Sequence, residues 1–190
     1  EIGPPKSASG ETVRKRARLL RGYADAFNLT DNQTAIVRLS SVASATLCVQ
    51  EGAEPVVQMT CRDRNRIGLQ SDLLGAAALG VRNVLCLSGD HPRFGNQKEA
   101  KSVYDIDPVQ ELMMFRMMRD EGKVWGGDVL EEAPNVYLGA VANPFADPFE
   151  LRVARLAKKV NAGAEFIQTQ AVFDLDRFER FMEQVRERRL

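Results

Sequence analysis

The stretch with the clearest chemical potential is Ser88-Gly89-Asp90-His91-Pro92, which follows directly on the apolar run Val84–Leu87. A carboxylate held at the end of a buried strand is placed for binding or for proton transfer rather than for packing. On the residues alone, Asp90 fits equally well as a turn residue that caps the backbone after Gly89. His91, the only histidine of the chain, follows a turn and is not assigned a catalytic role.

Polar side chains also stand at the ends of the other apolar runs: Glu1, Thr30 with Asp31 and Asn32, Gln58 with Thr60, Asn143 with Asp147, and Thr169 with Gln170. Sheets of parallel strands place their active sites at these carboxyl ends. A rim of amides, hydroxyls and carboxylates suits a heteroaromatic ring with alternating donors and acceptors, such as a pterin or a flavin. Lys6 is the only lysine near a strand end, which disfavours Schiff-base chemistry, and no serine or cysteine has a histidine base beside it for acyl transfer.

Composition narrows the class of partner. The 26 basic and 26 acidic side chains balance, so no overall field draws the chain to nucleic acid or to an anionic membrane. No apolar run approaches the roughly 18 residues that span a bilayer, and no signal or transit segment is visible. We therefore expect a soluble cytoplasmic protein that binds a small molecule or another protein.

The cysteines Cys48, Cys61 and Cys86 are widely spaced within apolar surroundings. This pattern indicates buried thiols in a reducing compartment rather than a disulfide framework. Without a CxxC pair and with one histidine, a zinc site is not expected. The methionines Met113, Met114, Met117 and Met118 have helical spacing and are expected to fill the core or subunit contacts.

Apolar periodicity predicts strands alternating with helices. Gly52, Gly80 and Gly163 each precede an apolar strand and are expected to end helices. Asp107-Pro108, Asp147-Pro148 and Asp174 are expected to begin them as capping residues. The strands are predicted near 1–3, 26–30, 55–61, 83–88, 136–142 and 165–170, and the helices near 11–25, 35–51, 65–79, 107–122, 148–162 and 174–188.

Strand–helix repetition without hairpin signals predicts an α/β fold with a parallel sheet. Both a (β/α)8 TIM-type barrel and an open doubly wound sheet fit, and the absence of GxGxxG after the first strand favours the barrel. A complete barrel takes about 250 residues, so we expect about six of its units in one domain, 1–190, incomplete at both ends. The long irregular stretches 89–106 and 121–135 are expected to be lids, binding loops or contact surfaces.

Six motifs in order give the chain a resemblance that covers essentially its whole length: Glu1-Ile2-Gly3-Pro4-Pro5-Lys6, Asn28-Leu29-Thr30-Asp31-Asn32, Gln58-Met59-Thr60-Cys61, Ser88-Gly89-Asp90-His91-Pro92, Ala142-Asn143-Pro144, and Gly163 to Gln170 with Phe173-Asp174. The chain resembles the methylenetetrahydrofolate reductases. The resemblance implies a flavoprotein oxidoreductase with a TIM-type barrel, which interconverts 5,10-methylene- and 5-methyltetrahydrofolate in one-carbon metabolism and methionine biosynthesis.

The resemblance also implies roles for particular residues. Glu1 matches the glutamate that acts as general acid on the folate, and Gln170 matches the glutamine that contacts the folate. Asp90 matches the aspartate beside the flavin pyrimidine edge and the pterin, where its charge disfavours an anionic reduced ring. The positions that line the flavin in the family are Thr30, Gln58, Ser88, Gly89, Asn143, Asp147 and Lys159. Without the resemblance, Asp147 is an ordinary helix cap and Glu1 a possible inward ion-pair partner.

At four of these positions the common bacterial enzymes carry other residues: histidine at Gln58, arginine at Ser88, tyrosine at Asn143 and histidine at Asp147. The set present here is closer to the branch of anaerobic bacteria and archaea. That likeness leaves FMN and FAD both open as cofactor. It implies an oligomer with an electron-donating or zinc-containing companion subunit.

Two alternatives stay open at this stage. The first is a flavin-free, folate-binding barrel subunit of a methyl-transfer complex, which the four departures support. The second is an unrelated barrel lyase with a phosphate loop in its remaining units.

Overall fold

The computed structural model describes residues 1–190 and contains one parallel sheet in the order β1-β2-β3-β4-β5. The strands are β1 Phe27–Leu29, β2 Pro55–Thr60, β3 Asn83–Leu87, β4 Tyr137–Ala142 and β5 Phe166–Thr169. The helices are α1 Glu11–Leu20, α2 Ser41–Gln50, α3 Arg66–Ala78, α4 Pro108–Asp120, α5 Glu150–Ala162 and α6 Leu175–Glu187, with short 3-10 turns η1 Gln33–Ala35 and η2 Pro92–Phe94.

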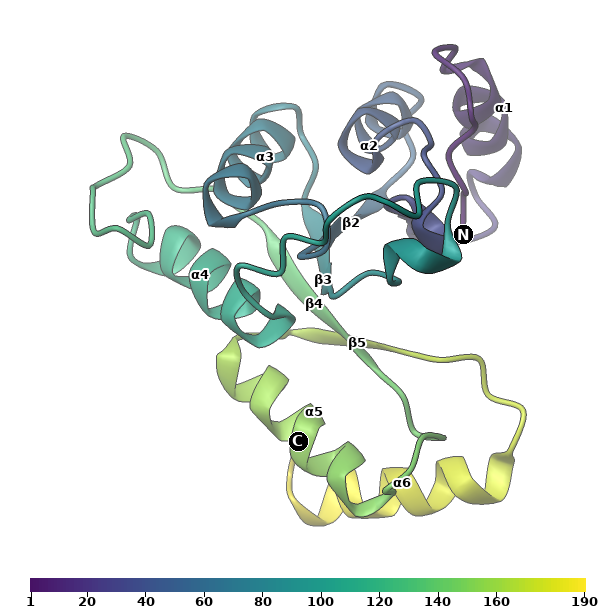
Figure 1. Ribbon diagram of the computed structural model, residues 1–190, viewed down its shortest axis with the longest axis vertical. Helices are drawn as coiled ribbons and strands as arrows, with labels where there is room; N and C mark the ends of the chain where they lie inside the picture. The colour runs from purple at the N-terminus through teal and green to yellow at the C-terminus, as the bar shows by residue number, and fades with distance from the viewer.

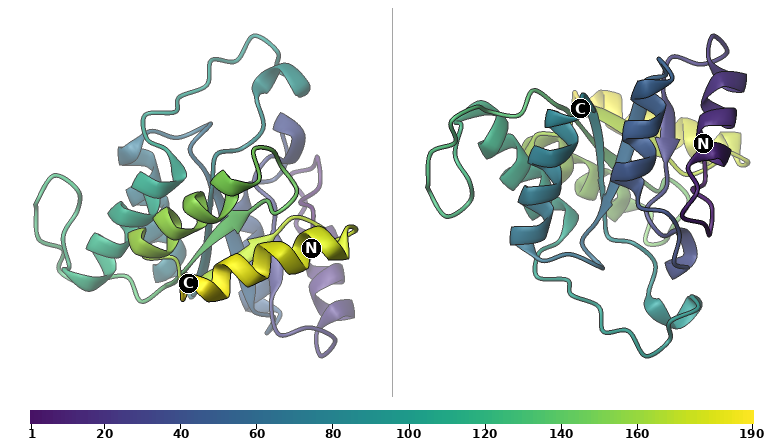
Figure 2. Two further views of the ribbon diagram at one scale, coloured as in Figure 1. Left: turned by 90° about the horizontal axis from the view of Figure 1, so that it is seen from below. Right: turned by 90° about the horizontal axis from the view of Figure 1, so that it is seen from above.

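The helices form an arc around the outer face of a curled sheet (Figure 1). Seen from above, α1, α2 and α3 lie next to one another along that face, and the view from below shows α5 and α6 at its other end (Figure 2). Each strand pairs in parallel with the next strand in sequence, so every connection crosses over through a helix. The predicted α/β architecture of a partial TIM-type barrel is confirmed.

The first predicted strand is reduced to a single bridge. Ile2 pairs with Leu29, and its N–H donates to the carbonyl of Asn28. The segment therefore follows the edge of β1 and brings Glu1 to the inner side of the sheet.

Two helices are shorter than predicted. α1 ends at Leu20 instead of residue 25, because Gly22 adopts a φ of +90° and turns the chain. α2 begins at Ser41 instead of residue 35, because Thr34 and Ala35 have positive φ values and Ser40 caps the helix by accepting from the N–H of Ala43.

Of the three predicted aspartate caps, two are confirmed. Asp107 forms a capping box with Gln110, and Asp174 accepts from the N–H of Arg177. The third prediction is wrong: α5 begins at Glu150 after Phe149, and the peptide bond between Asp147 and Pro148 is cis. The Asp147 carboxylate pairs instead with the guanidinium of Arg177, at 2.6 Å.

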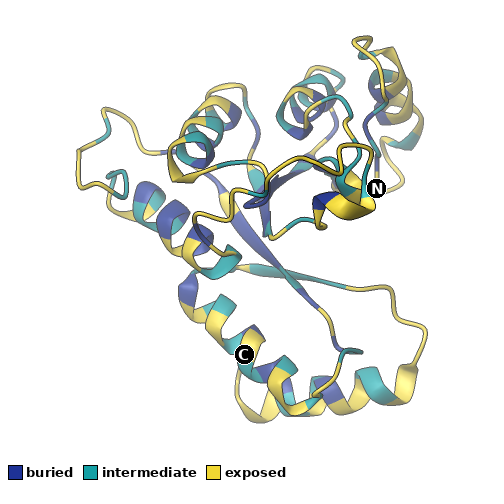
Figure 3. Ribbon diagram, viewed as in Figure 1, coloured by how far each residue is buried: buried dark blue, intermediate teal, exposed yellow.

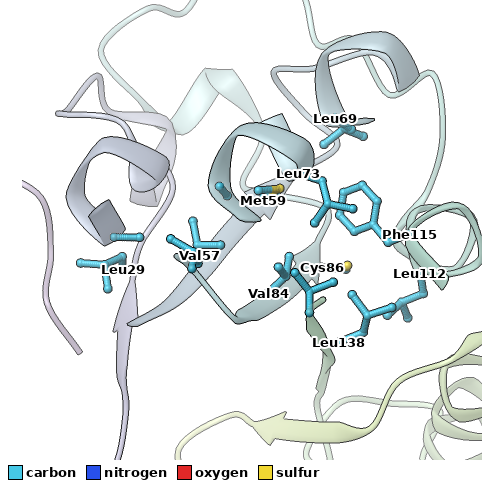
Figure 4. Close-up of a cluster of buried hydrophobic side chains, with 14 of the residues drawn as sticks. Leu29, Val57, Met59, Leu69, Leu73, Val84, Cys86, Leu112, Phe115 and Leu138 are labelled. Carbon is cyan, nitrogen blue, oxygen red and sulfur yellow. The ribbon is translucent and has the colours of Figure 1, made fainter. Parts of the chain in front are cut away.

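The main core lies between the sheet and α1 to α4, where alternate strand residues meet the inward faces of the helices (Figures 3 and 4). Met114 and Met118 are fully buried there, whereas Met113 is exposed. The three cysteines are buried and unpaired, as predicted. No helix has the length and apolar character needed to cross a membrane.

On the inner face of the sheet, side chains of neighbouring strands pack against one another. The rings of Tyr137 and Phe166 stack with centroids 5.4 Å apart. Gly139 is required beside them, because a Cβ there would lie 2.1 Å from the Phe166 ring. Further along the strands, Asn28 of β1 donates to Gln168 of β5 at 2.7 Å, joining the two outermost strands across the curled interior.

Candidate active site

A cavity of about 730 Å³ opens at the carboxyl ends of the strands. Its wall is mostly polar and includes eight of the residues selected from the sequence: Glu1, Thr30, Gln58, Ser88, Gly89, Asp90, Lys159 and Gln170. Val141 of β4 also lines the cavity, so residues at the ends of all five strands meet at one place, as expected for a barrel-type sheet. The volume is in the range of clefts that hold drug-sized ligands.

Asp90 is held from two sides at the mouth of β3. Its Oδ2 accepts a hydrogen bond from the N–H of Thr34 at 2.8 Å, and its carbonyl accepts one from Nη1 of Arg62 at 3.0 Å. Oδ1 has no partner within the protein and remains available to a ligand. Asp90 is exposed at the cavity rim, so its carboxylate can be reached by a bound molecule.

Gly89 allows this loop to sit close to β2. Its φ is +83°, and a Cβ there would lie 3.1 Å from Cβ of both Thr60 and Arg62. A side chain at this position would be strained by the backbone and crowded by both neighbours.

Asp31 forms a second fixed point under the cavity. Its side chain is fully buried, and Oδ2 accepts from the N–H and hydroxyl of Thr60 at 3.0 Å each and from Nη1 of Arg64 at 2.6 Å. Arg64 also donates to Asp72 of α3. These contacts connect the ends of β1 and β2 to α3. The charge of Asp31 is compensated within the protein by Arg64.

Several neutral polar groups face the cavity without a protein partner. Thr30 Oγ1 is buried and unpaired, and Gln58 is 8% exposed with no hydrogen bond to its amide. Gln168 has its Oε1 occupied by Asn28, which leaves the NH₂ group free. Buried polar groups are nearly always paired in folded proteins, so the Thr30 hydroxyl points to a polar ligand. The amides of Gln58 and Gln168 offer further groups to such a ligand.

A positive charge lies at the other side of the cavity. Lys159 of α5 is half-buried and donates to the carbonyl of Val141. Burial lowers the pKa of its amine, and the nearby Arg155 lowers it further. Lys159 also lines an adjoining cavity of about 180 Å³ with Asn143, Arg152 and Arg155. Three basic side chains and no carboxylate around this small cavity favour an anionic ligand.

Two of the selected residues lie outside the main cavity. Asn143 lines only the adjoining one, where its Oδ1 accepts from the N–H of Phe145. Asp147 lines neither, and its carboxylate is largely exposed beside Arg177.

Three polar residues of the cavity wall were not predicted from the sequence: Gln33, Arg62 and Gln168. Arg62 and Gln168 could have been found from alternation along a strand, whereas Gln33 lies in the turn η1. Gln58, Thr60 and Arg62 are spaced by two residues, as are Gln168 and Gln170, so each set continues on one face of the chain.

The fold and site together define an α/β barrel-type protein with a mostly polar cavity at the carboxyl ends of its strands. The family model described as methylenetetrahydrofolate reductase matches residues 1–190. The chain belongs to the methylenetetrahydrofolate reductase family.

Relatives and solved structures agree with this membership. The chain is 30% identical over 198 residues to "Probable methylenetetrahydrofolate reductase (NADPH)" of Caenorhabditis elegans, covering 98% of the chain and 28% of the relative. It is 27% identical over 200 residues to "Methylenetetrahydrofolate reductase (NADH) 1" of Arabidopsis thaliana, covering 98% and 32%. The chain thus spans about three tenths of the length of these relatives.

Among solved structures, a Clostridium thermocellum protein that binds two copies of 5-methyl-5,6,7,8-tetrahydrofolic acid has a TM-score of 0.63. It shares 14% identity, and the match covers 100% of this chain and 60% of that one. A 2,3-dimethylmalate lyase has a TM-score of 0.59 at 14% identity, covering 97% and 61%. At these identities the likeness establishes the shared barrel fold.

Proposed function

We propose that this chain forms the flavin- and folate-binding part of a reductase that interconverts 5,10-methylene- and 5-methyltetrahydrofolate. The observation that carries the proposal is the single cavity that gathers Glu1, Asp90 and Gln170 with Thr30, Gln58 and Lys159. These are six of the positions that the resemblance assigns to folate and flavin contacts.

The residues present fit a flavin. The unpaired Thr30 hydroxyl and Gln58 amide supply the hydrogen-bonding groups that a flavin ring requires, and both lie in the cavity wall. Lys159, with Arg155 and Asn143 beside it, supplies a site for a phosphate. A bound reduced flavin supplies the hydride for the methylene carbon.

The chain's own groups supply orientation and a proton. Glu1 is exposed in the cavity and, as a carboxylic acid, donates a proton to the folate nitrogen that leaves the methylene carbon when the five-membered ring opens. The Gln170 amide, also at the rim, orients the folate by hydrogen bonding. Asp90 keeps one oxygen free for the ligands while Thr34 fixes the other.

Asp147 has no part in this proposal, because its carboxylate is paired with Arg177 outside both cavities. Ser88 and Gly89 form a turn that carries no positive charge. The contacts to the flavin phosphate are therefore assigned to Lys159 and Arg155 in the adjoining cavity.

The test is reconstitution of the full-length protein with FMN and FAD in turn, followed by absorption spectroscopy and calorimetric titration with 5-methyltetrahydrofolate. We expect a stoichiometric flavin spectrum with one of the two cofactors, together with folate binding. Folate binding without any flavin spectrum would identify a flavin-free folate-binding subunit instead.

The electron donor is tested on the same flavin-loaded protein. Bleaching of the flavin by NADH or NADPH would show direct use of a nicotinamide. Failure of both, with bleaching by dithionite, would support the companion electron-donating subunit.

A further inference from the structure

Arg62 is the most deeply buried basic side chain that lines the cavity. Only 2% of its surface is exposed. It extends from the segment that follows β2 and lines the cavity together with Asp90. Burying an arginine is costly unless its donors are paired, so its partners indicate what it does.

The partners of Arg62 come from three strand ends. Nε and Nη2 donate to the two carboxylate oxygens of Asp63 at 2.7 and 2.6 Å. Nη1 donates to the carbonyl of Asp90 at 3.0 Å, and Nη2 also to the carbonyl of Asn32 at 3.3 Å. The two-point contact with Asp63 fixes the plane of the guanidinium, and the remaining donors are then directed at the loops after β1 and β3.

Those two loops also meet each other. The Asp90 carboxylate accepts from the N–H of Thr34, and Asn96 accepts from the N–H of Val37. Gly95 lies so close to Ala35 that a Cβ would overlap the Ala35 carbonyl, at 1.8 Å. Arg62 lies under this junction and contacts both sides of it, through Asn32 and Asp90.

We propose that Arg62 is a positioning residue that sets the location of the Asp90 carboxylate by holding its peptide carbonyl and the facing loop. The proposal rests on the proposed function of Asp90 as a flavin and folate neighbour. Four of the five N–H donors of Arg62 are taken by Asp63, Asn32 and Asp90, which leaves one N–H of Nη1. The main effect of Arg62 on the reaction is therefore expected to pass through Asp90, and the double-mutant cycle below separates it from a direct contact with a ligand.

The experiment is a double-mutant cycle in the full-length, flavin-loaded protein, measured as oxidation of 5-methyltetrahydrofolate with an artificial electron acceptor. Arg62→Met keeps the stem of the side chain and removes all its donors. We expect it to lower kcat by about tenfold to a hundredfold, since small displacements of a reacting group cost factors of this size. In the Asp90→Asn background the same change is expected to cost less than about twofold, because coupled residues are not additive.

Two further variants separate positioning from general stability. Arg62→Lys retains the charge and one donor nitrogen and is expected to restore part of the lost activity. It also replaces Arg62→Met in the cycle if that variant does not fold. Arg66→Met removes an arginine that pairs with Asp105 at the surface, away from the cavity, and is expected to leave kcat unchanged.

Hydrogen exchange provides a second readout that does not depend on turnover. It therefore tests the positioning role of Arg62 separately from the proposed enzymatic function. Hydrogen exchange of the segments 31–37 and 88–97 is expected to speed up in Arg62→Met and to stay unchanged in Arg66→Met. Unchanged exchange in Arg62→Met, or an equal loss of activity in the wild-type and Asp90→Asn backgrounds, would overturn the positioning role. Absence of turnover in the wild-type protein would count against the proposed function alone.

Discussion

The carboxyl group of Glu111 meets the thiol of Cys61 in the layer between α4 and the sheet, with 3.3 Å between Oε2 and Sγ. Glu111 is fully buried, and its other oxygen, Oε1, has no hydrogen-bond partner. Burial raises the pKa of Glu111 well above its ordinary value, and burial with the nearby Glu111 also raises the pKa of Cys61. The folded protein therefore holds a neutral acid and a neutral thiol behind β2 and β3.

This arrangement predicts how stability depends on pH. Above the ordinary pKa of 4.5 the unfolded chain loses the Glu111 proton, while the folded chain keeps it. The unfolded state then binds fewer protons, so the contribution of Glu111 to stability falls as pH rises, by up to about 1.4 kcal/mol per pH unit, until the folded pKa is reached. Glu111→Gln, which cannot ionise, should remove this slope.

The measurement is urea unfolding of the wild type and Glu111→Gln between about pH 5 and pH 8, the range that lies above the ordinary carboxyl pKa. We expect the variant to gain stability relative to the wild type as pH rises. Glu132→Gln, at an exposed position without side-chain hydrogen bonds, is the matched control and should run parallel to the wild type. A constant difference between wild type and Glu111→Gln at all pH values would show that Glu111 is already ionised in the folded protein.

The buried pair of Asp31 and Arg64 gives a second prediction. Arg64→Met leaves the Asp31 charge buried with only the Thr60 contacts. Breaking such a pair costs about 3–5 kcal/mol. Adding Asp31→Asn to that variant should recover part of the lost stability, because the uncompensated charge is then gone. Denaturant unfolding measures this recovery. If the double variant recovers no stability, the pair stabilises the fold through packing and not through its charges.

Gly89 gives a third prediction, with Gly127 as its control. Both have positive φ, but a Cβ at Gly127 meets nothing within 4 Å, whereas one at Gly89 meets Thr60 and Arg62 at 3.1 Å. Gly127→Ala should therefore show only the backbone strain, about 1–2 kcal/mol. Gly89→Ala should lose more stability than that and also lower folate affinity, measured by calorimetry. Equal stability losses with unchanged affinity would show that the Asp90 loop tolerates the displacement.

The fold was predictable because its signals are local. Alternating apolar runs, the capping box at Asp107 and the left-handed Gly163 at the end of α5 depend on neighbouring residues only. Two helix boundaries were wrong because of local turns at Gly22 and at Thr34-Ala35. The prediction for Asp147 failed because a distant contact decided the outcome. Asp147 precedes a proline as a helix cap would, yet it pairs with Arg177, 30 residues further along the chain.

The candidate site was predictable to a similar extent for the same reason. Gln58, Asp90 and Gln170 could be selected because each stands at the end of an apolar run, and all three meet in one cavity. The positioning role proposed for Arg62 could not be predicted from the sequence, because it depends on hydrogen bonds to the carbonyls of Asn32 and Asp90. These residues lie about 30 positions away on either side. Glu111 gave no signal, because nothing in the local pattern of α4 shows that the face carrying a carboxyl group is buried.

The most direct test of the proposed function is anaerobic addition of 5-methyltetrahydrofolate to the oxidised, flavin-loaded, full-length protein. We predict that the visible absorbance of the flavin bleaches, that 5,10-methylenetetrahydrofolate forms in equal amount, and that Asp90→Asn slows the bleaching. A flavin spectrum that does not change on addition of the folate would contradict the account.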